Sequence, residues 1–301
     1  MRPRAAARRG FTIMEVITAL VIIGILGLAM TKLILGQTRG FQNQMGGRRA
    51  RAAARSAMNI LITDLRMTQD FGGVVAASAD NRRIVVNVPV VFGIVCEVNA
   101  ANVVLSLIGA DTFQVASSKY GGYAVRIPST QVYGYSAAGS SDTVVSVSAG
   151  RCHGGGVNIF ADTGSIAGRA GRVVQASPAP PAGAVVGAPA FVYQQVVYAF
   201  RTSTAFPGRL GLYRTIAGRS GSDTLTEELI APFGDSAKFG YFVSPFPTRD
   251  SAVYTVPGNL NNIRGFRIKL PAESADTTPG RTTPQRTFTS TAVFFKNTRN
   301  P

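Results

Sequence analysis

Glu15 is the one acidic side chain within a long apolar stretch near the amino terminus. Over residues 11–35 only Glu15 and Lys32 are charged. A carboxylate at membrane depth costs several kcal/mol, so such groups are rare and are usually paired or functional. A glutamate near the end of a span can also reach the lipid headgroups. The position therefore predicts an ionic contact in an apolar environment or, alternatively, an interfacial side chain.

Few other side chains could support catalysis or metal binding. The 301 residues include two cysteines, no tryptophan and one histidine, His153. This is too few ligands for a four-cysteine zinc module or a His-rich metal site. The three glycines at 154–156 have no P-loop lysine or serine in register, and Ser220 lacks the glycine spacing of a nucleophile elbow. We therefore expect no enzyme, no cofactor and no metal site.

An apolar helix must position Glu15. The mean hydropathy of the chain is +0.16, and residues 11–35 supply the roughly 20 mostly apolar residues that a membrane span needs. Residues 1–10 carry four arginines and no acid. A secretory signal peptide would end in a small-x-small cleavage site, and none is convincing here. A plain signal anchor fits the length but leaves Glu15 unexplained.

Residues 8–16 read Arg-Arg-Gly-Phe-Thr-Ile-Met-Glu-Val. This pattern resembles the leader of type IV pilin-like proteins, in which a short basic segment ends in glycine, an aromatic residue follows, and a glutamate four residues later opens a long apolar helix. The resemblance implies a leader peptide over residues 1–10. It also implies that prepilin peptidase cleaves between Gly10 and Phe11 on the cytoplasmic side and methylates the Phe11 amine.

The chemistry of these residues agrees with that role. Gly10 has no side chain, so a protease can approach the backbone closely. Cleavage would create an α-amine at Phe11, and this amine could pair with Glu15 of a neighbouring subunit, each charge covering the other's desolvation. Arginines lie on both sides of the apolar stretch, so a count of positive charges does not orient it. The leader resemblance places the amino terminus in the cytoplasm.

The helical pattern continues beyond the apolar stretch. Ala54, Met58, Leu61, Ile62 and Leu65 fall on one face of a helix. We predict one helix over residues 12–67, about 80 Å long, with weak points at 36–40 and 46–47 because of their glycines. Its end, Asp64-Leu65-Arg66, resembles the "DLR" element of PilW-like minor pilins and of J-type pseudopilins of type II secretion.

The rest of the chain predicts a β-rich head. Runs rich in Val, Ile, Phe, Tyr and Thr, separated by Gly, Ser, Asn and Pro, indicate strands. They fall at about 83–95, 103–107, 123–127, 143–147, 191–200, 211–214, 238–243, 263–270 and 286–295. Residues 168–189, rich in Gly, Ala and Pro, are expected to form a loop between two sub-lobes.

The carboxyl-terminal third adds to the family resemblance. Leu212-Tyr213-Arg214, a strand over 262–268 and a final strand ending Lys296-Asn297 occur in the order seen in PilW-like and J-type proteins. Residues 72–189 match no family pattern. This middle region is longer than a J-type pseudopilin would usually need, which favours the pilus.

The implied topology places both cysteines in the periplasm, where disulfides are permitted. Cys96 and Cys152 are candidates for one bridge, the alternative being two buried free thiols. The formal charge is +16, of which the leader contributes four. Residues 68–301 hold 20 basic and 13 acidic side chains. This excess is spread along the chain, so it indicates a solvated basic surface, with nucleic acid as a candidate partner.

Together these features predict an α+β, pilin-like protein that serves as a minor pilin-like subunit of a type IV pilus. The parts are the leader (1–10), a transmembrane and filament-core helix (11–35), its amphipathic continuation (36–67) and a β-rich periplasmic head (68–301). The expected partners are prepilin peptidase, other pilin or pseudopilin subunits, the inner-membrane assembly platform and inner-membrane lipid. The expected location is the bacterial inner membrane and then the pilus or pseudopilus. A J-type pseudopilin and a DNA-binding pilin for natural transformation are the alternatives.

Overall fold

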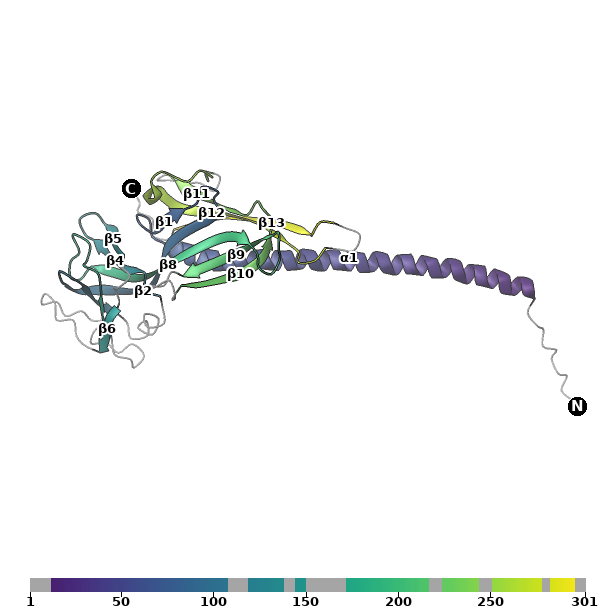
Figure 1. Ribbon diagram of the computed structural model, residues 1–301, viewed down its shortest axis with the longest axis horizontal. Helices are drawn as coiled ribbons and strands as arrows, with labels where there is room; N and C mark the ends of the chain where they lie inside the picture. The colour runs from purple at the N-terminus through teal and green to yellow at the C-terminus, as the bar shows by residue number, and fades with distance from the viewer. Residues whose placement is uncertain are drawn as a thin grey trace, which may run out of the picture.

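The protein consists of one long helix packed on a large antiparallel sheet, which confirms the predicted α+β class (Figure 1). The computed structural model describes residues 12–107, 119–137, 144–149, 172–216, 224–243, 251–277 and 282–295. Helix α1 runs from Ile13 to Met67 without interruption, and its amino-terminal half projects alone from the head (Figure 1).

Thirteen strands of the described residues form one sheet, and all their pairings are antiparallel. Its main order is β11-β12-β10-β9-β8-β2-β3-β7-β6; β1 pairs with β2, β13 with β12, and β4 with both β5 and β8. The strands are β1 (Val74–Ala77), β2 (Arg83–Val98), β3 (Val103–Leu107), β4 (Gly122–Ile127), β5 (Val132–Ala137), β6 (Val144–Ala149), β7 (Arg172–Ala176), β8 (Pro189–Thr202), β9 (Leu210–Ile216), β10 (Leu225–Phe233), β11 (Lys238–Val243), β12 (Ile263–Glu273) and β13 (Arg286–Phe294). A short 3-10 helix, η4 (Leu260–Asn262), precedes β12.

The glycines of α1 do not break it: the helix is continuous through 36–40 and 46–47, and a lower local stability at these expected weak points stays a prediction. Each glycine costs only about 1 kcal/mol in a helix interior, and helix propagation is cooperative once a nucleus exists. A Cβ added at Gly36 or Gly40 would meet nothing within 4 Å. At Gly46 it would lie 3.3 Å from the Ser274 Cβ, so the head packs closely on the helix there.

The second half of α1 forms the centre of the main core. Its buried side chains are Ala50, Ala54, Ala57, Met58, Leu61 and Leu65, and Ile62 is partly buried against them. This confirms the predicted apolar face. The helix contacts β12, β13, β10 and β2, whose inward residues include Phe233 and Phe266.

A second core cluster lies away from α1, at the end of the head that carries β4, β5 and β6 (Figure 1). Strands β2 and β8 are long enough to contribute to both clusters. Residues 172–176, expected to be part of a loop, form strand β7 and bury Val174 and Ala176 in this second cluster. The apolar run that pairs with β3 there outweighs the Gly- and Pro-rich composition around it.

The nine predicted strand runs all correspond to strands, but β1, β5, β7 and β10 were missed. The β10 sequence begins Leu-Thr-Glu-Glu, and its first three residues are exposed. A polar segment of this kind shows little alternation of apolar and polar residues, so its sequence does not indicate a strand. Pairing with β9 supplies the backbone hydrogen-bond partners that make β10 a strand.

Candidate functional site

The amino-terminal half of α1 presents an uncovered apolar surface. Every described side chain over residues 12–42 is exposed, including Ile13 at 80% and Leu33 at 62%. Soluble monomers rarely expose contiguous apolar patches this large. The helix is long and apolar enough to cross a membrane, which is compatible with a membrane anchor. The uncovered apolar surface is therefore a candidate for contact with lipid or protein.

Glu15 lies in the first turn of this helix. Thr12 is the N-cap, and its Oγ1 accepts a hydrogen bond from the Glu15 amide at 3.3 Å. A carboxylate in the first turn also interacts favourably with the positive end of the helix dipole. Within the described part of the chain Glu15 forms no ion pair. Gly10 and Phe11, the predicted cleavage and methylation residues, lie outside the described residues.

The end of α1 is attached to the sheet by a buried polar network. Asp64 Oδ2 lies 3.3 Å from Arg214 Nη2 and accepts a hydrogen bond from the Tyr198 hydroxyl. The side chains of Asp64 and Arg214 are 18% and 27% exposed, and Tyr198 is fully buried. Burial raises the pKa of Tyr198, and the neighbouring Asp64 carboxylate raises it further, so the hydroxyl is a stable donor. This network joins the "DLR" and "LYR" elements of the sequence.

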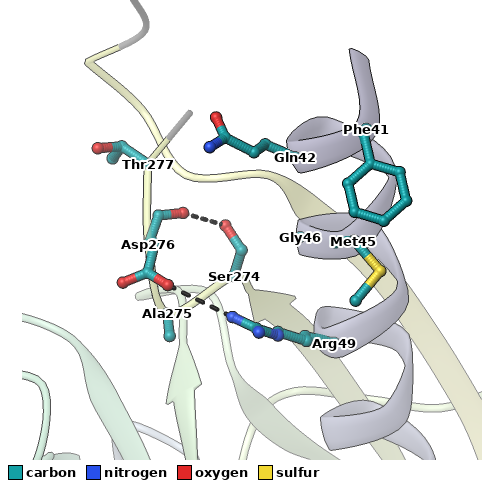
Figure 2. Close-up of a pocket in the computed structure, with 9 residues that line it drawn as sticks. All are labelled: Phe41, Gln42, Met45, Gly46, Arg49, Ser274, Ala275, Asp276 and Thr277. Carbon is teal, nitrogen blue, oxygen red and sulfur yellow. Dashed lines mark hydrogen bonds and ion pairs between the residues drawn. The ribbon is translucent and has the colours of Figure 1, made fainter. Parts of the chain in front are cut away.

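The loop between β12 and β13 attaches the middle of α1 to the head (Figure 2). Figure 2 shows Ser274, Ala275 and Asp276 facing Arg49 and Gly46 of the helix. Arg49 Nη1 lies 3.4 Å from Asp276 Oδ2, and Gln285 Nε2 donates to Asn43 Oδ1 at 3.1 Å. A cavity of about 450 Å³ opens on one side of this contact, with Phe41 and Met45 on its helix wall (Figure 2).

Two further acidic groups form ion pairs and hydrogen bonds within the head. Glu273 is 4% exposed and lies 2.8 Å from Arg286 Nε and 3.7 Å from Arg209 Nε. Glu228 accepts hydrogen bonds from the Ser203 and Thr204 hydroxyls, the Thr204 amide and the Tyr213 hydroxyl. Burial raises the pKa of Glu228, but these hydrogen bonds outweigh it and lower the pKa to about 2. Nothing in the local sequence predicted these contacts.

Cys96 is 1% exposed and disulfide-bonded. Cys152, His153 and Ser220 lie outside the described residues, so the predicted pairing of Cys96 with Cys152 stays a prediction. Among the residues that the structure does describe, no group of three or more His, Cys, Asp or Glu side chains could hold a metal ion.

Comparison of this chain with protein-family models, with curated proteins and with solved structures found no match.

Proposed function

We propose that this chain is a minor pilin-like subunit of a type IV pilus. It would be made as an inner-membrane precursor, cleaved between Gly10 and Phe11, and assembled into a filament through α1. The observation that carries the proposal is the division of one continuous helix into an exposed apolar half and a half packed on a β-rich head. The leader pattern at residues 8–16 adds independent support.

The uncovered apolar half suits a subunit that moves between two environments. In the precursor, lipid would cover this surface. In a filament, the same surface would be covered by the helices of neighbouring subunits, while the head stays outside. Because Glu15 sits in this apolar half, a cation from a neighbour, here the new Phe11 amine, would offset its desolvation.

Processing is tested first. The protein is purified from a host that has prepilin peptidase, and its intact mass is measured. We expect a chain that begins at methylated Phe11. An unprocessed Met1, or a cut near residue 35, would contradict the proposal.

Assembly is tested with Glu15 and Thr12 variants. Glu15→Ala keeps the backbone amide that Thr12 caps, so it removes the carboxylate without removing the cap. We expect normal cleavage but little protein in sheared filaments. Thr12→Val removes the capping hydroxyl and keeps the carboxylate, and we expect it to assemble. If both variants assembled equally poorly, Glu15 would contribute only by stabilising the amino terminus of α1, and the proposed ion pair with Phe11 would be contradicted.

A J-type pseudopilin would undergo the same processing. Deletion of the gene separates the two systems: we expect loss of surface pili with normal protein secretion. Loss of secretion with intact pili would support the pseudopilin instead.

A further inference from the structure

A basic groove lies between α1 and the first residues of β13. Its cavity measures about 440 Å³, and its wall carries three arginines, Arg48, Arg51 and Arg286. The amides of Asn43, Gln44 and Gln285 also line it. No carboxylate and no aromatic ring is among the described residues that form this wall.

The helix side of the basic groove is a stripe of unbalanced positive charge. Gln44, Arg48 and Arg51 follow one another at helical spacing on one face, and both arginines are exposed. The Arg51 side chain lies over Gly47, because a Cβ added at Gly47 would be 4.0 Å from Arg51 Nη2. Like charges at this spacing destabilise a helix, and no acid stands three or four residues from either arginine.

The sheet side adds a third cation that is only partly balanced. Arg286 Nε lies 2.8 Å from Glu273 Oε1, but Glu273 also lies 3.7 Å from Arg209 Nε. One carboxylate therefore serves two guanidinium groups. The Arg286 guanidinium is a planar fork with five N–H donors, and its side chain is 68% exposed. The basic groove thus has a net positive charge and free arginine donors.

The dimensions exclude lipid phosphate as the natural ligand. Arg48 lies thirteen residues beyond Leu35, which is about 20 Å along the helix. The headgroup layer extends only about 5–7 Å beyond the hydrocarbon core. A membrane that holds residues 11–35 would leave its phosphates well short of the basic groove.

The chemistry of the wall favours a peptide over a single-stranded nucleic acid. Single-stranded nucleic acids are held by aromatic stacking platforms, and no ring lines this wall. Arginine forks bind carboxylates bidentately, and the exposed Gln44 adds a side-chain amide that can pair with peptide N–H and C=O groups. A second copy of this chain is a poor partner, because residues 68–301 hold 20 basic and only 13 acidic side chains.

We propose that the basic groove binds an acidic peptide segment of a different subunit in the filament. The filament context and the exclusion of lipid phosphate rest on the proposed function; the affinity of the groove for acidic peptide does not. The stripe on α1 and the partly balanced Arg286 then form one carboxylate-binding site at the junction of helix and head.

The test uses the full chain in uncharged detergent micelles and a fluorescent hexaglutamate peptide, with binding followed by anisotropy. The Arg48→Gln/Arg51→Gln variant removes two groove charges, and we expect about tenfold weaker binding. The matched control is Arg39→Gln/Arg66→Gln, which removes two exposed charges of α1 outside the groove. We expect it to weaken binding less than about twofold.

Four outcomes would overturn the proposal. They are no binding of hexaglutamate, equal loss in the two double variants, equally tight binding of a hexaglutamine peptide, and tighter binding of a single-stranded oligonucleotide of equal charge. Charge reversal provides a second test. The Arg48→Glu/Arg51→Glu variant should bind a hexalysine peptide, which the original chain should not bind. If this variant did not bind hexalysine, the result would also contradict the proposed site. The mass of the amino terminus is measured on the same samples, so failure of processing and failure of the groove are seen separately.

Discussion

Asp64 of α1 and Arg214 of β9 form an ion pair whose Oδ2 and Nη2 atoms lie 3.3 Å apart. The same carboxylate oxygen accepts a hydrogen bond from the Tyr198 hydroxyl of β8. One side chain at the end of the helix therefore holds two neighbouring strands. It joins the end of α1 to β8 and β9, whereas the apolar face of the helix packs on β12, β13, β10 and β2.

Asp64→Ala should lower the free energy of unfolding by about 2–4 kcal/mol. The substitution leaves the largely buried Arg214 and Tyr198 without their acceptor, and an orphaned buried partner costs more than the bond itself contributed. Urea denaturation followed by tyrosine fluorescence measures the change, since the chain has no tryptophan. The control is Arg66→Ala, an exposed neighbour, for which we expect a change below about 0.5 kcal/mol. Equal effects of the two substitutions would refute the role of the pair.

Gly46 and Gly47 should respond in opposite directions to alanine. At Gly47 the new methyl meets only the end of the Arg51 side chain, so Gly47→Ala should add about 1 kcal/mol through helix propensity. At Gly46 it would lie 3.3 Å from Ser274 Cβ and 3.4 Å from Gln285 Cγ, so the β12–β13 loop must move. We expect no gain, or a loss of about 1 kcal/mol. Urea midpoints of the two variants decide; an equal gain at both sites would mean that the loop does not pack on Gly46.

Glu228 should make the stability of the head depend on pH below about 4.5. Its pKa in the folded protein is about 2, below the ordinary value of 4.5, so the ionised carboxylate stabilises the fold. That contribution is fully present above about pH 4.5 and is lost as pH falls to about 2. The difference in unfolding free energy between the original chain and Glu228→Gln should therefore shrink over this range.

Glu227→Gln serves as the control, because Glu227 is exposed and next in sequence. At pH 7 this substitution should change the free energy of unfolding by less than about 0.5 kcal/mol. A difference between the original chain and Glu228→Gln that stayed constant from pH 7 to pH 2 would contradict the hydrogen-bonded, ionised state of Glu228.

Reduction should destabilise the chain, because Cys96 is buried and disulfide-bonded. A bridge from Cys96 to Cys152 would contribute up to about 4 kcal/mol. We expect a reducing agent to lower the urea midpoint of the original chain but not that of Cys96→Ser, and the two reduced proteins should agree. Peptide mapping without reduction should find Cys96 linked to Cys152; two unlinked thiols would refute the pairing.

The elements of the fold were largely predictable because their signals are local. The period of Ala54, Met58, Leu61 and Leu65 identified the packed face of α1, and alternating or β-branched runs identified nine strands. Strands β1, β5, β7 and β10 were missed for different reasons: a glycine interrupts β5 and two glutamates interrupt β10, whereas β1 and β7 are only four and five residues long. Their pairing with β2, β4, β3 and β9, respectively, rather than their own propensity, makes them strands.

The junction of helix and head was not predictable in the same way. The "DLR" and "LYR" elements were recognised separately, but nothing local joins Asp64 to Arg214. The sequence shows the run Arg48-Arg49-Ala50-Arg51 as a cluster of positive charge. Only the fold shows that its arginines have different surroundings. Arg49 turns to Asp276, while Arg48 and Arg51 line the basic groove with Arg286.

The sequence by itself determined a long apolar helix, its amphipathic continuation and a β-rich head, since each follows from side-chain hydrophobicity at short spacing. Only the tertiary structure decided which charged side chains form ion pairs and which glycine of α1 packs against the head. Those properties depend on the distance between groups from remote parts of the chain. The sheet packs against one particular segment of α1. This packing creates the ion pair of Asp64, the close contact at Gly46 and the unbalanced arginines of the basic groove.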